Sequence, residues 1–221
     1  MDEILKNKNV KDWSRVKDFG EVNTNISTIH DMLQTVSNEL FRIDSKFLEP
    51  ACGDGNFLKE ILIKKLEIIE KKYSKSQNEF EKFSLLACSS IYGIDILVDN
   101  IELAKKRLLE IFKLKYASLF KDIKNEVLDS FKFILSQNIV QGDALTFKSN
   151  NKEENSVILP EWSLINNMFK RRDFKFKDVV HYKPIEGLNL FSDLGDEAFI
   201  PEPIKDYPLV NYLKIHESFS L

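Results

Sequence analysis

The feature that most constrains the fold is a Gly-Asp-Gly turn in the stretch FLEPACGDGNFL, residues 47–58, between a short apolar run and a long amphipathic one. Glycine weakens regular elements, and the chain has only seven glycines in 221 residues, so Gly53 and Gly55 mark a turn with a specific requirement. Pro50 disfavours a helix through Glu49, which makes the preceding apolar run a buried strand. After the turn, apolar residues recur at helical spacing. The stretch therefore predicts a strand, a tight turn and the start of a helix.

Two later segments also place a short apolar run before an acidic loop. IYGIDI, residues 91–96, contains Asp95 and precedes a helical pattern, and NIVQGDAL, residues 138–145, contains Asp143. Strands that alternate with helices predict an open parallel sheet of the α/β class. Such sheets bind ligands at the carboxyl ends of their strands. We therefore expect the three loops to meet at one edge of the sheet.

The first loop favours a small, positively charged ligand over a dinucleotide. Gly53 and Gly55 let the backbone approach a ligand at a helix N-terminus, where free N–H groups bind carboxylate or phosphate. Leu58 stands where the dinucleotide-binding pattern has its third glycine, which disfavours a pyrophosphate. Glu49 adds a negative charge that an ammonium or sulfonium group tolerates and a phosphate does not. Taken alone, the loop is also consistent with a plain strand-to-helix turn, which we consider the less favoured interpretation.

The second and third loops supply acceptors suited to a nucleoside. Asp95 can accept hydrogen bonds from both hydroxyls of a ribose, and Ile96 can pack on an adenine face. Asp143 can accept a hydrogen bond from an adenine amino group. Read in isolation, Asp95 is more often a helix cap and Asp143 an ordinary turn residue. The three loops together, each after a short strand, favour a single ligand site.

The segments FLEPACGDGNFLKEIL, YGIDILVDNIELAKKRL and NIVQGDAL resemble the cofactor motifs of S-adenosylmethionine-dependent DNA methyltransferases of the adenine-N6 type, found in restriction-modification systems. DFGEVNTN, residues 18–25, resembles the N-terminal motif Gly-Glu-Val-Phe-Thr-Pro of that family, with Asn23 and Asn25 at the usual Phe and Pro positions. The resemblance covers about residues 16–147. It implies a Rossmann-like methyltransferase sheet and S-adenosylmethionine as the cofactor.

The resemblance also implies which residues hold the cofactor. The first loop would surround its methionine part, Asp95 would bind the ribose hydroxyls, Asp143 would hold the adenine amino group, and Thr24 would touch the methionine end. The expected cofactor-binding residues are Thr24, Glu49, Pro50, Ala51, Gly53, Gly55, Asn56, Phe57, Asp95, Ile96, Asp143 and Ala144.

The catalytic motif of the family, Asn/Asp-Pro-Pro-Tyr/Phe after the fourth strand, is absent from the sequence. VILPEWSL stands at the expected place, where Pro160, Glu161 and Trp162 offer a proline, an acceptor and an aromatic ring. We interpret Trp162 as a core or interface aromatic residue. The catalytic residues are therefore unassigned. Two hypotheses follow: an enzyme that methylates adenine N6 in DNA, or a cofactor-binding subunit that acts with a second subunit or as a homodimer.

The composition changes after residue 160. Residues 168–183 interleave basic and aromatic side chains, which can hold phosphates and stack bases of DNA, although such runs are usually solvated amphipathic elements. The rest is acidic and proline-rich, and predicts no strand or long helix. We expect a sheet that is short at its C-terminus. The predicted segments are an N-terminal helical segment with a cofactor-contacting motif (1–45), a methyltransferase core (46–160) and an irregular tail (161–221).

The overall composition excludes several other classes. A net charge of -3 gives no global preference for nucleic acid, so DNA contact needs a local basic patch. Cys52 and Cys88 form neither a disulfide framework nor a zinc pattern, which predicts reduced thiols and a cytoplasmic protein. His30, His181 and His216 share no metal-binding spacing. No apolar run approaches the roughly 20 residues of a membrane span, so we expect no membrane partner.

Overall fold

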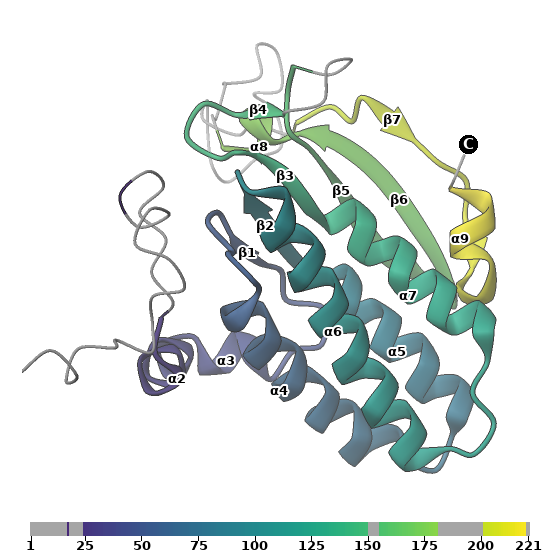
Figure 1. Ribbon diagram of the computed structural model, residues 1–221. Helices are drawn as coiled ribbons and strands as arrows, with labels where there is room; N and C mark the ends of the chain where they lie inside the picture. Colours follow the sequence, from purple (N-terminus) through teal and green to yellow (C-terminus); the bar gives the residue numbers. More distant parts are fainter. Residues whose placement is uncertain (1–16, 18–23, 150–154, 181–200, 220–221) are drawn as a thin grey trace, which may run out of the picture.

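The computed structural model describes residues 17, 24–149, 155–180 and 201–219, and Figure 1 shows how their helices and strands are arranged. Two helices separate the first strand from the second, and two more separate the second from the third. The elements up to the third strand are α2 (Ile26–Thr35), α3 (Ser37–Leu40), β1 (Phe47–Glu49), α4 (Asn56–Tyr73), α5 (Gln77–Ser89), β2 (Ile91–Asp95), α6 (Val98–Leu119), α7 (Asn125–Asn138) and β3 (Ile139–Asp143). The later elements are β4 (Lys148–Ser149), β5 (Ile158–Ile165), β6 (Met168–Lys175), α8 (Phe176–Val180), β7 (Lys205–Asp206), β8 (Val210–Asn211), η2 (Tyr212–Lys214) and α9 (Ile215–Ser218).

The first sheet has the strand order β1-β2-β3-β4. The first three strands are parallel, with Phe47 opposite Ile91 and Gly93 opposite Ile139, whereas β4 is antiparallel to β3. Parallel neighbours need long crossovers, which α4–α5 and α6–α7 provide. This confirms the expected α/β class. The three parallel strands have the order of one half of a doubly wound sheet, and β1 lies at its edge.

The helices are much longer than the strands they connect. α4 has 18 residues and α6 has 22. At a rise of about 1.5 Å per residue they span about 27 and 33 Å, against about 17 Å for a five-residue strand. They extend past the amino ends of the strands and pack there with α5 and α7 (Figure 1). Phe80, Phe112, Tyr116 and Phe131 form the centre of this bundle, which fixes the helix N-termini at the loops after the strands.

The described part of the tail is not irregular, so that expectation is wrong. β5 and β6 form an antiparallel hairpin of two eight-residue strands, and β7 and β8 both pair with β6. The turn is formed by Asn166 and Asn167, with φ of 50° and 64°, which suits a two-residue hairpin turn. β5 begins within VILPEWSL, continues to Ile165 and belongs to this second sheet, not to the parallel one. The division of the chain at residues 45 and 160 stays a prediction, and the second boundary falls inside β5.

The N-terminal segment is helical where the structure describes it. α2 begins at Ile26, because Asn25 caps it by accepting a hydrogen bond from the Ser27 N–H. Ile29 and Leu33 of α2 are buried. Most of DFGEVNTN lies outside the described residues. Among the helices of the described residues, none is long and apolar enough to cross a membrane.

Candidate cofactor site at the carboxyl ends of the strands

The Gly-Asp-Gly turn between β1 and α4 requires both glycines, for different reasons. Gly53 has φ +52° and Gly55 has φ +83°, a region that residues with a side chain rarely adopt. A Cβ on Gly55 would lie 2.9 Å from Ala104 Cβ on α6, so this glycine allows α6 to approach the turn. A Cβ on Gly53 would meet nothing within 4 Å. Gly53 therefore faces open space, where a ligand can approach the backbone.

The close helix–strand contact that a third glycine would provide is made at Gly93 of β2. A Cβ there would lie 2.8 Å from Leu58 Cδ1 and 2.9 Å from Cys52 Sγ. Leu58 is fully buried, so α4 packs on the sheet through a leucine seated over a strand glycine. Gly93 is a residue that the motifs of the sequence did not single out. The available indication was a glycine inside a strand pattern, which often marks a close backbone approach.

Asp95 joins the first two loops. Its Oδ2 accepts a hydrogen bond from the Gly53 N–H at 2.9 Å. Its Oδ1 accepts from the Leu97 N–H at 2.8 Å and from Asn100 Nδ2 at 3.4 Å. Asp95 thus holds the backbone at the start of α6 and also fixes the turn after β1. The structure brings together two of the three loops that the sequence places in one site.

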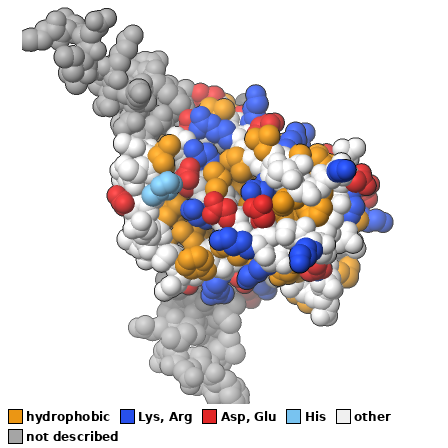
Figure 2. Space-filling model, turned by 90° about the horizontal axis from the view of Figure 1, so that it is seen from below, with side chains coloured by type: hydrophobic (Ala, Val, Ile, Leu, Met, Phe, Trp, Pro, Cys, Tyr) orange, Lys and Arg blue, Asp and Glu red, His pale blue; other side chains and the backbone are white. Residues whose placement is uncertain are grey.

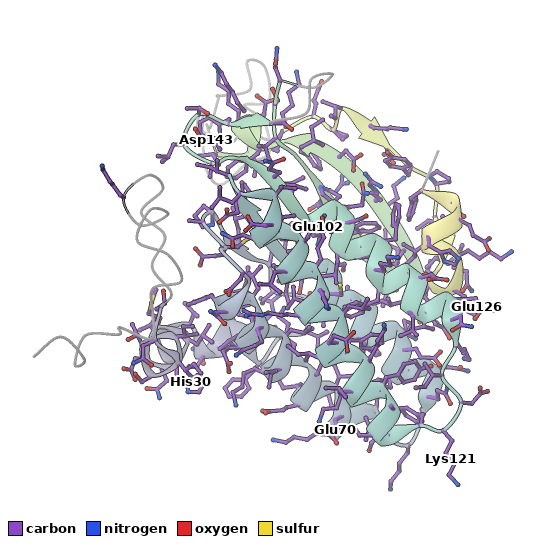
Figure 3. All side chains as sticks on the ribbon, in the orientation of Figure 1. His30, Glu70, Glu102, Lys121, Glu126 and Asp143 are labelled. Atoms are coloured by element: carbon purple, nitrogen blue, oxygen red, sulfur yellow. The ribbon has the colours of Figure 1, made fainter. Side chains whose placement is uncertain are left out.

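The third loop lies beside them but is organised by its own contacts. Gln141 Nε2 donates to the Ile96 carbonyl at 2.9 Å, which ties β3 to the loop after β2. Asp143 accepts from the Leu145 N–H and from the N–H and hydroxyl of Thr146, and these bonds lower its pKa, the hydroxyl most strongly. In this structure Asp143 therefore serves as a turn residue. Figure 3 shows it at the end of the molecule that carries the carboxyl ends of the strands, with His30 far from it on α2.

The site is negatively charged. Burial raises the pKa of Glu49, although a hydrogen bond with the Ala51 backbone opposes the shift. Burial also raises the pKa of the Cys52 thiol, and the neighbouring charges of Asp95, Glu49 and Asp54 raise it further. Cys52 is thus a neutral, buried residue. An acidic loop cluster of this kind favours a cationic ligand over a phosphate.

One carboxylate of the turn is neutralised internally. Asp54 is buried, and Arg107 of α6 lies 3.0 Å from its Oδ2. The same guanidinium donates to the Asp54 carbonyl at 3.1 Å and to Asn56 Oδ1 at 3.2 Å. These bonds fix the turn against α6. Asp54 and Arg107 were not singled out from the sequence, because nothing local predicts a pair 53 positions apart.

The remaining expected residues surround the turn with fewer contacts. Pro50 and Ala51 are exposed, Phe57 and Ala144 are half-buried, and Ile96 is 49% exposed. Thr24 is exposed directly before α2, and within the described ranges no hydrogen bond or ion pair links it to the turn after β1. Its place in the site stays a prediction. No group of three or more His, Cys, Asp or Glu residues in the described part of the chain is arranged to hold a metal ion.

Comparison with known families decides how this edge of the sheet is to be interpreted. The model of a family described as MmeI, DNA-methyltransferase domain, matches residues 22–157. The chain belongs to the MmeI DNA-methyltransferase domain family. The match includes all three loops and the second half of DFGEVNTN. No curated protein and no solved structure matches the chain.

The match to the MmeI DNA-methyltransferase family ends immediately before β5, where the sequence lacks the expected catalytic motif. Trp162 is 4% exposed, and its Nε1 donates to Asn138 Oδ1 at 2.8 Å. This confirms its interpretation as a core aromatic residue. Glu161 forms ion pairs with Lys46, at 2.7 Å, and with Arg172. Burial opposes ionisation of Glu161, but these two cations lower its pKa overall, so it is a paired carboxylate.

The basic and aromatic run lies on β6 and α8, where most of its cations are paired. Arg171 is buried and forms two hydrogen bonds with Asp173, and Lys170 pairs with Asp206. Lys175 is exposed. On the face of the molecule drawn in Figure 2, basic and acidic side chains alternate with apolar ones. DNA contact through this run stays a prediction, and Tyr182 and Lys183 lie outside the described residues.

Proposed function

We propose that the chain binds S-adenosylmethionine at the loops after β1, β2 and β3, as part of a system that methylates adenine N6 in DNA. The observation that carries the proposal is the hydrogen bond from the Gly53 N–H to Asp95 Oδ2, at 2.9 Å, beside the open space in front of Gly53. It joins the loop suited to an amino-acid moiety to the carboxylate suited to a ribose. Family membership supports the same assignment.

The charges and acceptors of the site fit this cofactor. Glu49 and Asp95 favour its ammonium and sulfonium groups. A carboxylate offers about four acceptor positions, and Asp95 uses three of them, for Gly53, Leu97 and Asn100. Among the contacts of the described residues, this leaves one position on Oδ2 for a ribose hydroxyl. The second hydroxyl would displace Asn100, whose bond of 3.4 Å is the longest of the three.

The cofactor would supply a methyl group that the adenine amino nitrogen attacks in line, while the electron pair of the S–C bond stays on sulfur. The residues of this chain would bind and orient the cofactor, which is a large part of catalysis in a reaction between two positioned groups. The amino proton needs an acceptor near the nitrogen. Glu161 is a poor candidate, because Lys46 and Arg172 hold it as an ion pair.

Two observations favour a second function: the sequence has no Asn-Pro-Pro or Asp-Pro-Pro, and Trp162 at the corresponding place is buried. A buried indole that bonds Asn138 cannot stack on a flipped base without local opening. The chain would then be a cofactor-binding subunit whose catalytic residues come from a partner.

The test is a methyl-transfer assay with labelled cofactor and unmethylated duplex DNA, combined with calorimetry of cofactor binding. We expect binding of S-adenosylmethionine by the wild type. Asp95→Ala should weaken binding by about 1.5–3 kcal/mol, roughly 10- to 150-fold, since charge-assisted bonds are lost. Asp129→Asn, at an exposed position of α7, is the control. Absence of binding by the wild type would refute both functions, whereas binding without turnover would leave the subunit role.

A further inference from the structure

One edge of β1 is free among the described residues. Within those ranges β1 pairs only with β2, and the Phe47 N–H donates to the Ser90 carbonyl at 2.9 Å. In a parallel ladder, alternate residues bond to opposite neighbours. The peptide groups of Leu48 therefore point away from β2, toward an edge that no described strand covers. Leu48 is 42% exposed.

An apolar cavity adjoins this edge, with a volume of about 350 Å³. β1 forms one wall, and β5, β6 and α8 form the other. Its apolar lining includes Phe47, Leu48, Leu159, Phe174, Phe176 and Val179. A free strand edge beside an apolar pocket is the arrangement that proteins use to accept an added strand, because main-chain bonds give affinity and the pocket receives alternate side chains.

Among the described residues that line this cavity, the charged groups are unbalanced by one positive charge. Lys46 and Arg172 both line it, and both pair with the single carboxylate of Glu161. A segment that brings one carboxylate opposite these cations would balance the charge. This favours an acidic residue in the occupant over a basic one.

The position of β1 in the sheet indicates what a segment bound at its free edge would do. In open α/β sheets the ligand crevice lies where the strand order reverses, between two strands whose crossovers lead to opposite faces. The Gly53 turn follows β1, but β1 is an edge strand, so the described residues form only one wall of that crevice. A strand added beside β1 would form the other wall.

We propose that the free edge of β1 and the adjoining cavity accept an extended segment of a second polypeptide of different sequence, with apolar side chains in the cavity and one carboxylate opposite Lys46 and Arg172. The proposal rests on the proposed function, because it completes the same cofactor crevice. In this arrangement the second polypeptide stands where an acceptor for the adenine amino proton is needed.

The test selects binders from a phage-displayed library of random twelve-residue peptides on the immobilised chain. We expect enriched peptides with alternating apolar residues and one Asp or Glu. Leu48→Pro removes the outward N–H but keeps the bonds of β1 to β2, and Pro is tolerated on edge strands. It should weaken the selected peptides at least about tenfold. Val179→Glu, in the cavity lining, should do the same, whereas Val180→Glu, its exposed neighbour outside the lining, should not.

Circular dichroism checks that each variant is folded. No enrichment, or equal binding to the wild type and Leu48→Pro, would overturn the proposal. A dimer of the chain alone that Leu48→Pro dissociates would also overturn it, because a second copy would then occupy the edge. Calorimetry with S-adenosylmethionine distinguishes failure of the docking proposal from failure of the proposed function. If the cofactor binds but no peptide is enriched, only the docking proposal at the β1 edge is refuted. If peptides bind but the cofactor does not, the proposed function fails.

Discussion

Substituting alanine at Gly53 and at Gly55 distinguishes a glycine that faces open space from one that packs against α6. Both have positive φ, so alanine at either position costs about 1–2 kcal/mol of backbone strain. At Gly53 the new methyl group meets nothing within 4 Å, and strain is the whole cost. At Gly55 it lies 2.9 Å from Ala104 Cβ and 3.1 Å from Ala104 Cα, which adds about 1–3 kcal/mol of overpacking.

Urea unfolding followed by circular dichroism should therefore show a loss of about 1–2 kcal/mol for Gly53→Ala and about 2–5 kcal/mol for Gly55→Ala. Cofactor binding, measured by calorimetry, should be affected in the opposite order, with the larger loss for Gly53→Ala. Gly53→Ala should reduce binding of S-adenosylmethionine strongly, and Gly53→Val should abolish it in a folded protein, because the side chain fills the space where the ligand approaches. Equal destabilisation by the two alanines, or unchanged binding by Gly53→Val, would refute this reasoning.

Three further predictions concern residues away from the turn. Burial lowers the pKa of Lys65 to about 7, so between that pH and about 10 this residue binds more protons in the unfolded chain than in the folded one. Its contribution to the unfolding free energy should therefore rise over this window, so in urea titrations the unfolding free energy of the wild type should rise relative to that of Lys65→Met from pH 7 to about pH 10. Trp162→Phe removes the bond to the buried Asn138 Oδ1 and should cost about 1–3 kcal/mol of stability while leaving cofactor binding unchanged by calorimetry. The isolated chain should form little or no N6-methyladenine in a time course on duplex DNA, and Glu161→Gln should not change that rate; robust turnover that this substitution abolishes would make Glu161 catalytic.

Much of the core could be predicted from local patterns. The short apolar runs before the three acidic loops gave β1, β2 and β3, because a buried strand has no helical period and ends at a turn. The stripe of apolar residues after Gly55 gave α4, and the spacing after Asp95 gave α6. Asp95 was expected to serve either as a helix cap or as a ligand acceptor. In the structure its carboxylate accepts from the N–H of Leu97, the N-cap residue of α6, and its role as a ligand acceptor stays a prediction.

Other features depend on contacts between distant residues. The β5–β6 hairpin was not predicted, although Asn166 and Asn167 flanked by alternating apolar residues are a hairpin pattern, because the basic residues of β6 are more typical of a solvated element. The ion pair of Lys46 with Glu161 joins positions 115 apart, and no spacing rule predicts it. The edge position of β1 likewise follows from strand order, which the sequence alone did not specify.

The most direct test of the central claim is hydrogen–deuterium exchange of the purified chain with and without S-adenosylmethionine. If the cofactor binds where the three loops meet, amide exchange should slow in residues 50–57, 94–98 and 141–146, with the Gly53 turn most protected. The bundle end of α7, residues 125–132, should exchange at the same rate in both samples. Protection confined to other regions, such as the β5–β6 hairpin, or no protection at saturating cofactor, would contradict a cofactor site at the carboxyl ends of these strands.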